Sequence, residues 1–84
     1  MQDQENNVFR IGDVVTLKLN PEFRAVIQYF CSPKGNSFEV SFEKSIENDS
    51  LFMWANLSWL DSDNKILALQ VPVIHLKHVE ESNT

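Results

Sequence analysis

Few side chains in this sequence combine in a pattern that enzymes or metal sites use. The single cysteine, Cys31, lies in no motif that would activate a thiolate. His75 and His78 form a His-x-x-His pair, but no cysteine cluster and no third ligand at a suitable spacing accompanies them. We therefore expect Cys31 to be a small core residue, His75 to cap a turn and His78 to face solvent, with no metal and no cofactor.

Two further patterns resemble binding loops but are better explained as turns. Gly12 and Gly35 are the only glycines, so the chain has no glycine-rich loop for phosphate. Asp61 and Asp63 have the spacing of calcium ligands, yet neither the loop glycine nor the bidentate glutamate of a calcium loop follows them. This inventory predicts that the protein is not an enzyme.

Composition and charge restrict the partners. The 84 residues are enough for one domain, and 12 acidic against 7 basic side chains give a net charge of −5. The basic residues are scattered, whereas nonspecific nucleic-acid binding needs a basic stripe. No apolar run reaches the length of a membrane span, and residues 1–7 do not look like a secretory signal. With one cysteine, these features favour a reduced, cytoplasmic protein of acidic surface.

Hydrophobic periodicity predicts short strands separated by turns. In the first strand, Val15, Leu17 and Leu19 share the buried face. The run over 23–30 has no clear parity, because Phe23, Ala25, Ile27 and Tyr29 form one set while Val26 and Phe30 form the other. The expected elements are strands over 13–19, 23–30, 38–42, 51–59, 66–71 and 77–80, a type I turn at 32–35, a polar turn at 61–64 and a 3₁₀ turn over 73–76.

Three segments resemble a known family. The opening Ile11-Gly12-Asp13-Val14-Val15-Thr16-Leu17-Lys18 resembles that of small bacterial Src-homology-3-like β-barrel proteins of unknown function, which are related in shape to KOW and Tudor domains. Residues 57–61 are similar to the family's strand with a central tryptophan, although Leu60 stands where an aromatic residue is common. Residues 71–79 are similar to its closing turn and strand. The resemblance implies an all-β fold, a small Src-homology-3-like barrel of five to six antiparallel strands with a short 3₁₀ turn before the last strand.

The predicted strands divide the chain into one domain and two tails. Residues 8–80 are predicted to form the single β-barrel domain, and residues 1–7 and 81–84 to be tails, the first of them disordered. Residues 31–50 are predicted to form an extra hairpin that the minimal family pattern lacks.

Aromatic residues beyond the needs of the core are the main functional signal. If alternate residues of the strand over 51–59 face inward, namely Leu51, Met53, Leu57 and Trp59, then Phe52, Trp54 and Leu60 face outward. Tyr29 or Phe30 must also lie on the outer side of its strand, unless a bulge intervenes. Phe52, Trp54, Phe30 and Tyr29 are therefore the expected partner-binding residues. The alternative is that the hairpin over 31–50 covers them with Phe38, Val40 and Phe42.

These observations favour a non-catalytic binding module that contacts another protein through exposed aromatic residues. Self-association as a homodimer, through an edge strand or the aromatic residues, is a variant of that hypothesis. The alternatives are a KOW-like nucleic-acid-associated module, in which bases stack on aromatic side chains, and a small acidic inhibitor that occupies a partner's basic groove.

Overall fold

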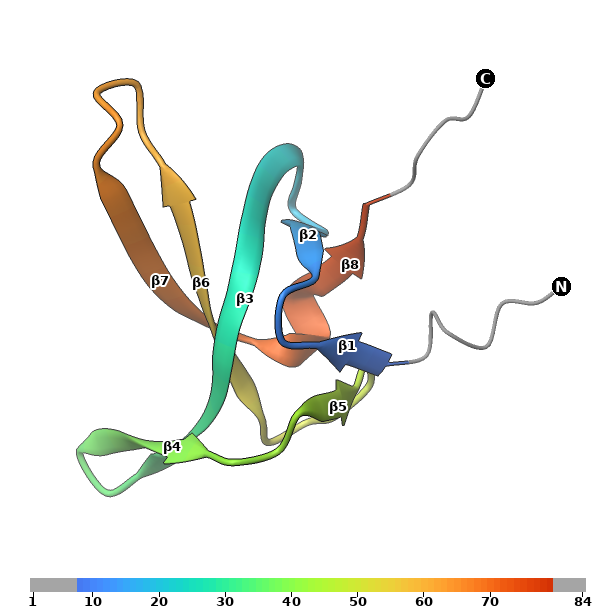
Figure 1. Ribbon diagram of the computed structural model, residues 1–84. Helices are drawn as coiled ribbons and strands as arrows, with labels where there is room; N and C mark the ends of the chain where they lie inside the picture. The colour runs from blue at the N-terminus through green and yellow to red at the C-terminus, as the bar shows by residue number, and fades with distance from the viewer. Residues whose placement is uncertain (1–7, 80–84) are drawn as a thin grey trace, which may run out of the picture.

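The computed structural model describes residues 8–79, so the predicted tails at 1–7 and 81–84, and residue 80, lie outside the described residues. The fold is all-β, and a 3₁₀ helix precedes the last strand, as predicted (Figure 1). The elements are β1 (Val8–Arg10), β2 (Val14–Leu17), β3 (Asn20–Lys34), β4 (Ser37–Ser41), β5 (Ser45–Glu47), β6 (Trp54–Leu60), β7 (Ile66–Pro72), η2 (Val73–His75) and β8 (Leu76–His78). None of the described residues forms a helix that could cross a bilayer.

The long strand β3 organises the larger sheet, whose order is β7-β6-β3-β2-β8. One edge of β3 pairs with β6, while its other edge pairs first with β2 and then, toward its end, with β4. A separate two-stranded sheet joins β1 to β5. Within residues 8–79 no ladder joins β7 to β8, so the sheet is open and the Src-homology-3-like barrel remains a prediction.

The core fills the inner face of this open sheet. Val15 and Leu57 are buried in it, and Leu17 and Trp59 pack against it while partly exposed. The prediction that Leu19 and Leu51 face inward is wrong, because β2 ends at Leu17 and β6 begins at Trp54, which leaves both leucines exposed outside the strands. The buried cluster consists of Phe9, Val15, Ala25, Ile27, Phe30, Ala55, Leu57, Val73 and Leu76.

A bulge explains the unclear parity of the second apolar run. The register of β3 on β6 shifts between Ile27 and Tyr29, so that one extra residue is inserted and the side-chain alternation is reset. Ile27 faces the core before the bulge and Phe30 faces it after the bulge. Tyr29 is only half-buried.

The turn between β3 and β4 differs from the prediction. Residues 32–34 continue β3, and the turn itself is the two-residue Gly35-Asn36. Gly35 has a φ of +60°, at the first central position, where type II′ hairpins need a positive φ. The type I turn at 32–35 is therefore wrong, because the strand runs on through Pro33.

The turn between β6 and β7 occupies the predicted residues. The Oδ1 atom of Asp61 accepts hydrogen bonds from the backbone N–H groups of Asp63 (2.7 Å) and Lys65 (2.9 Å). Asn64 completes the turn with a φ of 62°, a conformation that asparagine tolerates better than most residues. The aspartates thus act within a turn, as the sequence analysis expects.

Candidate functional site

The structure separates the four predicted partner-binding residues. Phe52 lies in the loop before β6 and is 79% exposed, and Trp54 begins β6 and is half-buried. Tyr29 is half-buried in β3. Phe30 is fully buried in the core, so its assignment to a contact surface is wrong. The bulge before Tyr29 is the physical reason, because it turns Phe30 inward.

Trp54 lies on the face of the sheet opposite the core, which we call the outer face. Residues directly opposite one another in antiparallel ladders place their side chains on the same face. Trp54 is opposite Cys31 of β3 on one side and Pro72 of β7 on the other. Cys31 is in turn opposite Val40 of β4. Strands β7, β6, β3 and β4 therefore contribute to one continuous outer face around Trp54.

Phe38, from β4, contacts Trp54 across this face. Their ring centroids are 5.0 Å apart with an interplanar angle of 62°, an edge-to-face arrangement. Of the three residues predicted to cover the aromatic side chains from the hairpin over 31–50, Phe38 thus covers part of Trp54. The other two do not serve as a cover in the same way, because Val40 is half exposed and Phe42 is 94% exposed.

Cys31 lies in the ladders between Val40 and Trp54 and has no accessible surface. Burial raises the pKa of the Cys31 thiol, since desolvation disfavours the thiolate. Because the thiolate is the nucleophilic form, this environment suits a packing residue. The structure therefore gives Cys31 the role of a small buried side chain under the outer face.

A hollow of about 420 Å³ opens beside the aromatic pair. Asn56 on its wall is held in place, because its Nδ2 donates a hydrogen bond to Gln28 Oε1 at 2.9 Å. Gln70 is directly opposite Asn56 in the β6–β7 ladder, which brings a second side-chain amide to the hollow. The walls thus combine apolar surface with two amides, a combination that suits an apolar group attached to a hydrogen-bonding chain. The lining residues are Phe38, Trp54, Asn56, Ala68, Leu69 and Gln70.

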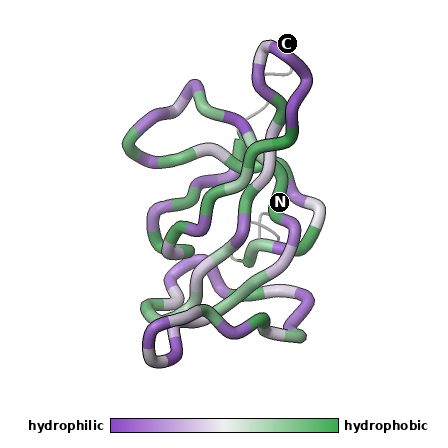
Figure 2. The backbone as a smooth tube through the Cα atoms, turned by 90° about the vertical axis from the view of Figure 1, so that its left-hand side faces the viewer, coloured by the Kyte–Doolittle hydropathy of each residue, from purple (hydrophilic) through white to green (hydrophobic). Residues whose placement is uncertain are grey.

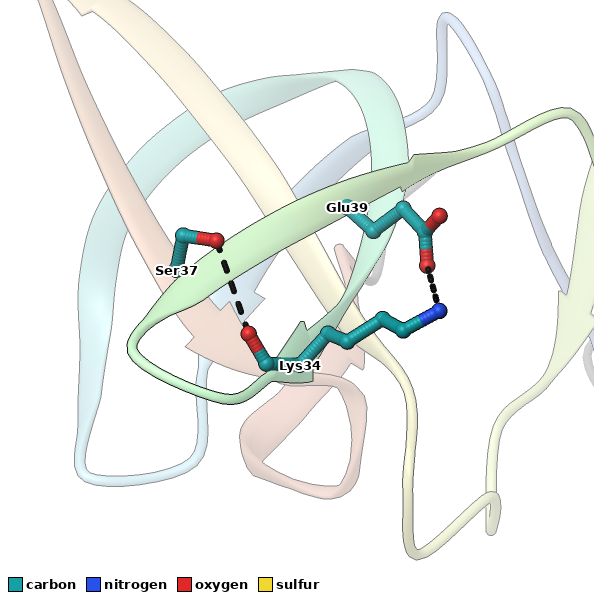
Figure 3. A network of polar contacts seen from close by, with 3 residues as sticks. All are labelled: Lys34, Ser37 and Glu39. Atoms are coloured by element: carbon teal, nitrogen blue, oxygen red, sulfur yellow. Dashed lines mark hydrogen bonds and ion pairs between the residues drawn. The ribbon is translucent and has the colours of Figure 1, made fainter.

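The hairpin that carries Phe38 ends in polar contacts rather than in apolar packing (Figure 3). The Nζ atom of Lys34 is 3.6 Å from Glu39 Oε1, and Ser37 Oγ donates a hydrogen bond to the carbonyl oxygen of Lys34 at 3.5 Å. Both side chains of the ion pair are well exposed, and exposed pairs contribute little to stability. The ladder with β3 and the Gly35 turn therefore hold Phe38 in position.

A second hollow, of about 950 Å³, lies at the β8 end of the molecule. It contains His78, whose Nε2 is 2.9 Å from the carbonyl oxygen of Val8 and whose ring stacks on Phe9 at 4.4 Å. The prediction of a solvent-facing His78 is wrong, because these contacts use the imidazole to tie β8 to β1. The hollow is lined by Phe9, Lys18, Asn48, Asp49, Leu51, Ile74, Leu76, Lys77, His78 and Val79.

The two histidines do not come together as metal ligands would. His75 is exposed, and its carbonyl oxygen accepts a hydrogen bond from the backbone N–H of Lys18 at 2.9 Å. Among residues 8–79, no three His, Cys, Asp or Glu side chains gather in a group that could hold a metal ion. We therefore take the hollow beside Trp54 as the candidate site, since the imidazole of the larger hollow, His78, is engaged in tying β8 to β1.

Sequence reasoning identified Trp54 but missed most of its surroundings. Asn56, Ala68 and Gln70 lie on the outer face because of the β6–β7 register, and Phe38 reaches Trp54 through the β3–β4 ladder. The period-two alternation over 54–60 is the local signal that puts Asn56 on the same face as Trp54, but it does not say which strands are neighbours. No protein-family model, curated protein or solved structure matches this chain.

Proposed function

We propose that this protein is a non-catalytic module that binds another protein through the outer aromatic patch, defined as Phe38, Trp54 and the hollow beside them. The edge-to-face pair on an open sheet face is the observation that carries this proposal. Aromatic side chains of this kind supply large contact area with few rotatable bonds, and they dominate the energetics of many interfaces.

The chemistry of the hollow supports a peptide segment with an apolar anchor as the partner. The rings of Phe38 and Trp54, with the side chain of Ala68, would surround the apolar side chain. The amides of Asn56 and Gln70 would donate to, or accept from, peptide groups on either side of that anchor. A buried anchor with a few polar contacts at its rim is a common arrangement in protein recognition.

The two alternative functions differ from this one in their dependence on salt. Nucleic-acid binding and occupation of a basic groove both depend on charge and weaken steeply as salt concentration rises. Binding of an apolar anchor by the outer aromatic patch depends mainly on burial and changes little with salt. The acidic net charge of −5 and the scattered basic residues favour the peptide partner over nucleic acid.

A displayed library of random peptides tests the proposal, with selection on the full chain and counter-selection on the Trp54→Ala variant. We expect the enriched peptides to share an aromatic or large aliphatic anchor. Trp54→Ala and Phe38→Ala should weaken their binding by about tenfold or more, the effect of losing a hot-spot residue. The matched control is Phe42→Ala, which removes an aromatic ring that is 94% exposed on the same hairpin and should leave binding unchanged.

Three results would contradict the proposal. The first is enrichment of no peptide, and the second is equal binding by the native chain and Trp54→Ala. The third is binding that falls by about two orders of magnitude between low and moderate salt, which would instead favour the charge-dependent alternatives. Circular dichroism melting of each variant separates a lost contact from a lost fold.

A further inference from the structure

Strand β7 forms an outer edge of the larger sheet and exposes apolar side chains on both of its faces. Within residues 8–79 its one neighbour is β6, with which it pairs over all seven residues. Ile66, on the outer face, is 73% exposed. Leu67 and Leu69, on the inner face, are 39% and 44% exposed because the open sheet leaves this part of the core side uncovered. Figure 2 shows the molecule from the side on which β7 lies, with the polar tip of the β6–β7 hairpin at the top.

The hydrogen bonds at the two ends of the β6–β7 ladder show which backbone groups point to the free edge. The N–H of Val73 donates to the carbonyl of Met53, and the N–H of Asp61 donates to the carbonyl of Lys65. Hydrogen-bonded and non-hydrogen-bonded pairs alternate along an antiparallel ladder, so Leu67 and Leu69 bond to β6. The N–H and C=O groups of the intervening residues, Ile66, Ala68 and Gln70, therefore point away from β6.

Among the described residues, Pro72 at the end of β7 is the one usual protection of this edge against pairing with another strand. Natural sheets protect such edges with charged side chains, proline, bulges or a covering segment. The sequence of β7, Ile-Leu-Ala-Leu-Gln-Val-Pro, contains no charged residue, and its register on β6 has no shift. The chain as a whole carries a net charge of −5, so an uncharged strip is where two copies can approach without strong repulsion.

We propose that β7 pairs with β7 of a second copy of this chain, antiparallel and about a two-fold axis that passes beside Ala68. In this register Ala68 faces Ala68 of the second copy, and Ile66 faces Gln70 of the second copy. Each of these pairs exchanges N–H···O=C hydrogen bonds, which satisfies the groups that point to the free edge. The strand is thus complementary to itself, as a two-fold interface requires.

Pro72 and the two leucines favour this register over its neighbour. A shift of the axis to Gln70 would place Pro72 opposite Ala68, where proline has no N–H to donate. With the axis at Ala68, Pro72 lies outside the bonded pairs. The inner-face residue Leu67 then faces Leu69 of the second copy, and the converse pair forms by symmetry. Both leucines lose the exposure that they have in the single chain.

The pairing would extend one sheet through both copies. Because the two-fold axis is perpendicular to the sheet, both outer aromatic patches would lie on the same side of the assembly. Pairing through the edge of β7 does not require that the outer aromatic patch binds a peptide. Peptide binding can therefore fail while the dimer forms, and the dimer can fail to form while the peptide binds.

Sedimentation of the full chain, from about 5 to about 500 µM, tests the pairing, since a single-strand contact is a small interface. We expect a reversible dimer. Ala68→Pro should raise its dissociation constant by about tenfold or more, because it removes an N–H that β6 does not use and adds bulk at the axis. The matched control is Val40→Pro on β4, another edge strand of the same sheet, which should leave the dimer unchanged.

A cross-link keeps the test decisive if the Ala68→Pro variant unfolds. Opposed residues of a bonded antiparallel pair have Cα atoms about 5.5 Å apart, within the range of a disulfide. Ala68→Cys, oxidised with copper phenanthroline, should therefore form a covalent dimer, whereas Ser62→Cys in the hairpin turn should not. Buried Cys31 does not compete. A monomer throughout the concentration range, a dimer unaffected by Ala68→Pro, or no cross-link in the Ala68→Cys variant would each overturn the proposal.

Discussion

The hairpins β3–β4 and β6–β7 both end in an exposed edge strand, yet they differ in how they are supported and how they are protected. In β6–β7, Ala55 and Leu57 bury their side chains in the core, and the free edge is uncharged. In β3–β4, Phe30 and Cys31 at the base are the last fully buried residues, and the strand β4 is exposed or half-exposed throughout.

The free edge of β4 illustrates a different solution to the same problem. The two residues that flank a two-residue turn, here Lys34 and Ser37, form a hydrogen-bonded pair. Bonded and non-bonded pairs alternate along the ladder, so the backbone N–H and C=O groups of Phe38 and Val40 point away from β3 to the free edge. That edge is shorter, carries Glu39 and is followed by Glu43 and Lys44. A charged residue within the strand and a short length disfavour pairing of β4 with another chain, whereas the seven residues of β7 include no charged side chain. Both β4 and β7 have an exposed edge. The difference shows that only β7 combines this exposure with a strand suited to pairing with another chain.

The largest effect should separate the supports of the two hairpins. Leu57→Ala removes a fully buried side chain from β6 and should lower the free energy of unfolding by about 2–5 kcal/mol. Val40→Ala, at a half-exposed position of β4, should cost less than about 1 kcal/mol. Chemical denaturation of both variants checks this, and equal losses would mean that the β4 strand is part of the core.

The next effect concerns the turns. Asp61→Ala removes the acceptor of two backbone N–H groups in the β6–β7 turn and should cost about 1–2 kcal/mol, as for loss of a helix-capping side chain. Asp61→Asn is the matched control, because its side-chain oxygen can accept the same bonds. Thermal melting followed by circular dichroism is the measurement. A loss for Asn as large as that for Ala would contradict the role of Oδ1.

Thiol reactivity tests the contact between the β3–β4 hairpin and Trp54. Cys31 is fully buried and its pKa is raised by burial, so Ellman's reagent should modify it slowly in the native chain. Phe38→Ala opens one side of the aromatic pair and should raise the rate by about tenfold, through easier local opening. Phe42→Ala should leave the rate unchanged. Equal rates in all three proteins would show that Phe38 does not cover this part of the sheet.

The smallest effect is expected at the ion pair of the β3–β4 hairpin. Glu39→Gln breaks the 3.6 Å contact with Lys34, but both side chains are exposed, so the change in unfolding free energy should stay within about 0.5 kcal/mol. A denaturation curve with and without added salt measures it. A loss of more than about 1 kcal/mol would mean that charge pairing supports this hairpin as well as protecting its edge.

Local patterns predicted those parts of the fold that depend on neighbouring residues. The alternation around Ala55 and Leu57, the polar turn after Leu60 and the 3₁₀ turn before the last strand are of this kind. The sequence pattern puts Phe30 on the surface, but a bulge resets the parity of β3, and its position is set by pairing with a strand more than twenty residues away. It puts His78 in solvent because the contacts of that ring, Val8 and Phe9, lie about seventy residues earlier.

The candidate site shows the same division. Trp54 and Phe52 could be predicted as surplus aromatic residues, but the contact of Trp54 with Phe38 requires the register of two ladders. Gln70 reaches the hollow only through its pairing with Asn56. The availability of β7 also could not be read from its composition, since an identical apolar run in a central strand would have no free edge.

Amide hydrogen exchange, read residue by residue by NMR at about 5 and about 500 µM, tests the contrast between the two edges most directly. The outward amides of β7, at Ile66, Ala68 and Gln70, should become protected as the concentration rises, while those of β4, at Phe38 and Val40, should exchange at one rate throughout. Fast exchange of the β7 amides at both concentrations, or equal protection of the two edges, would contradict the account.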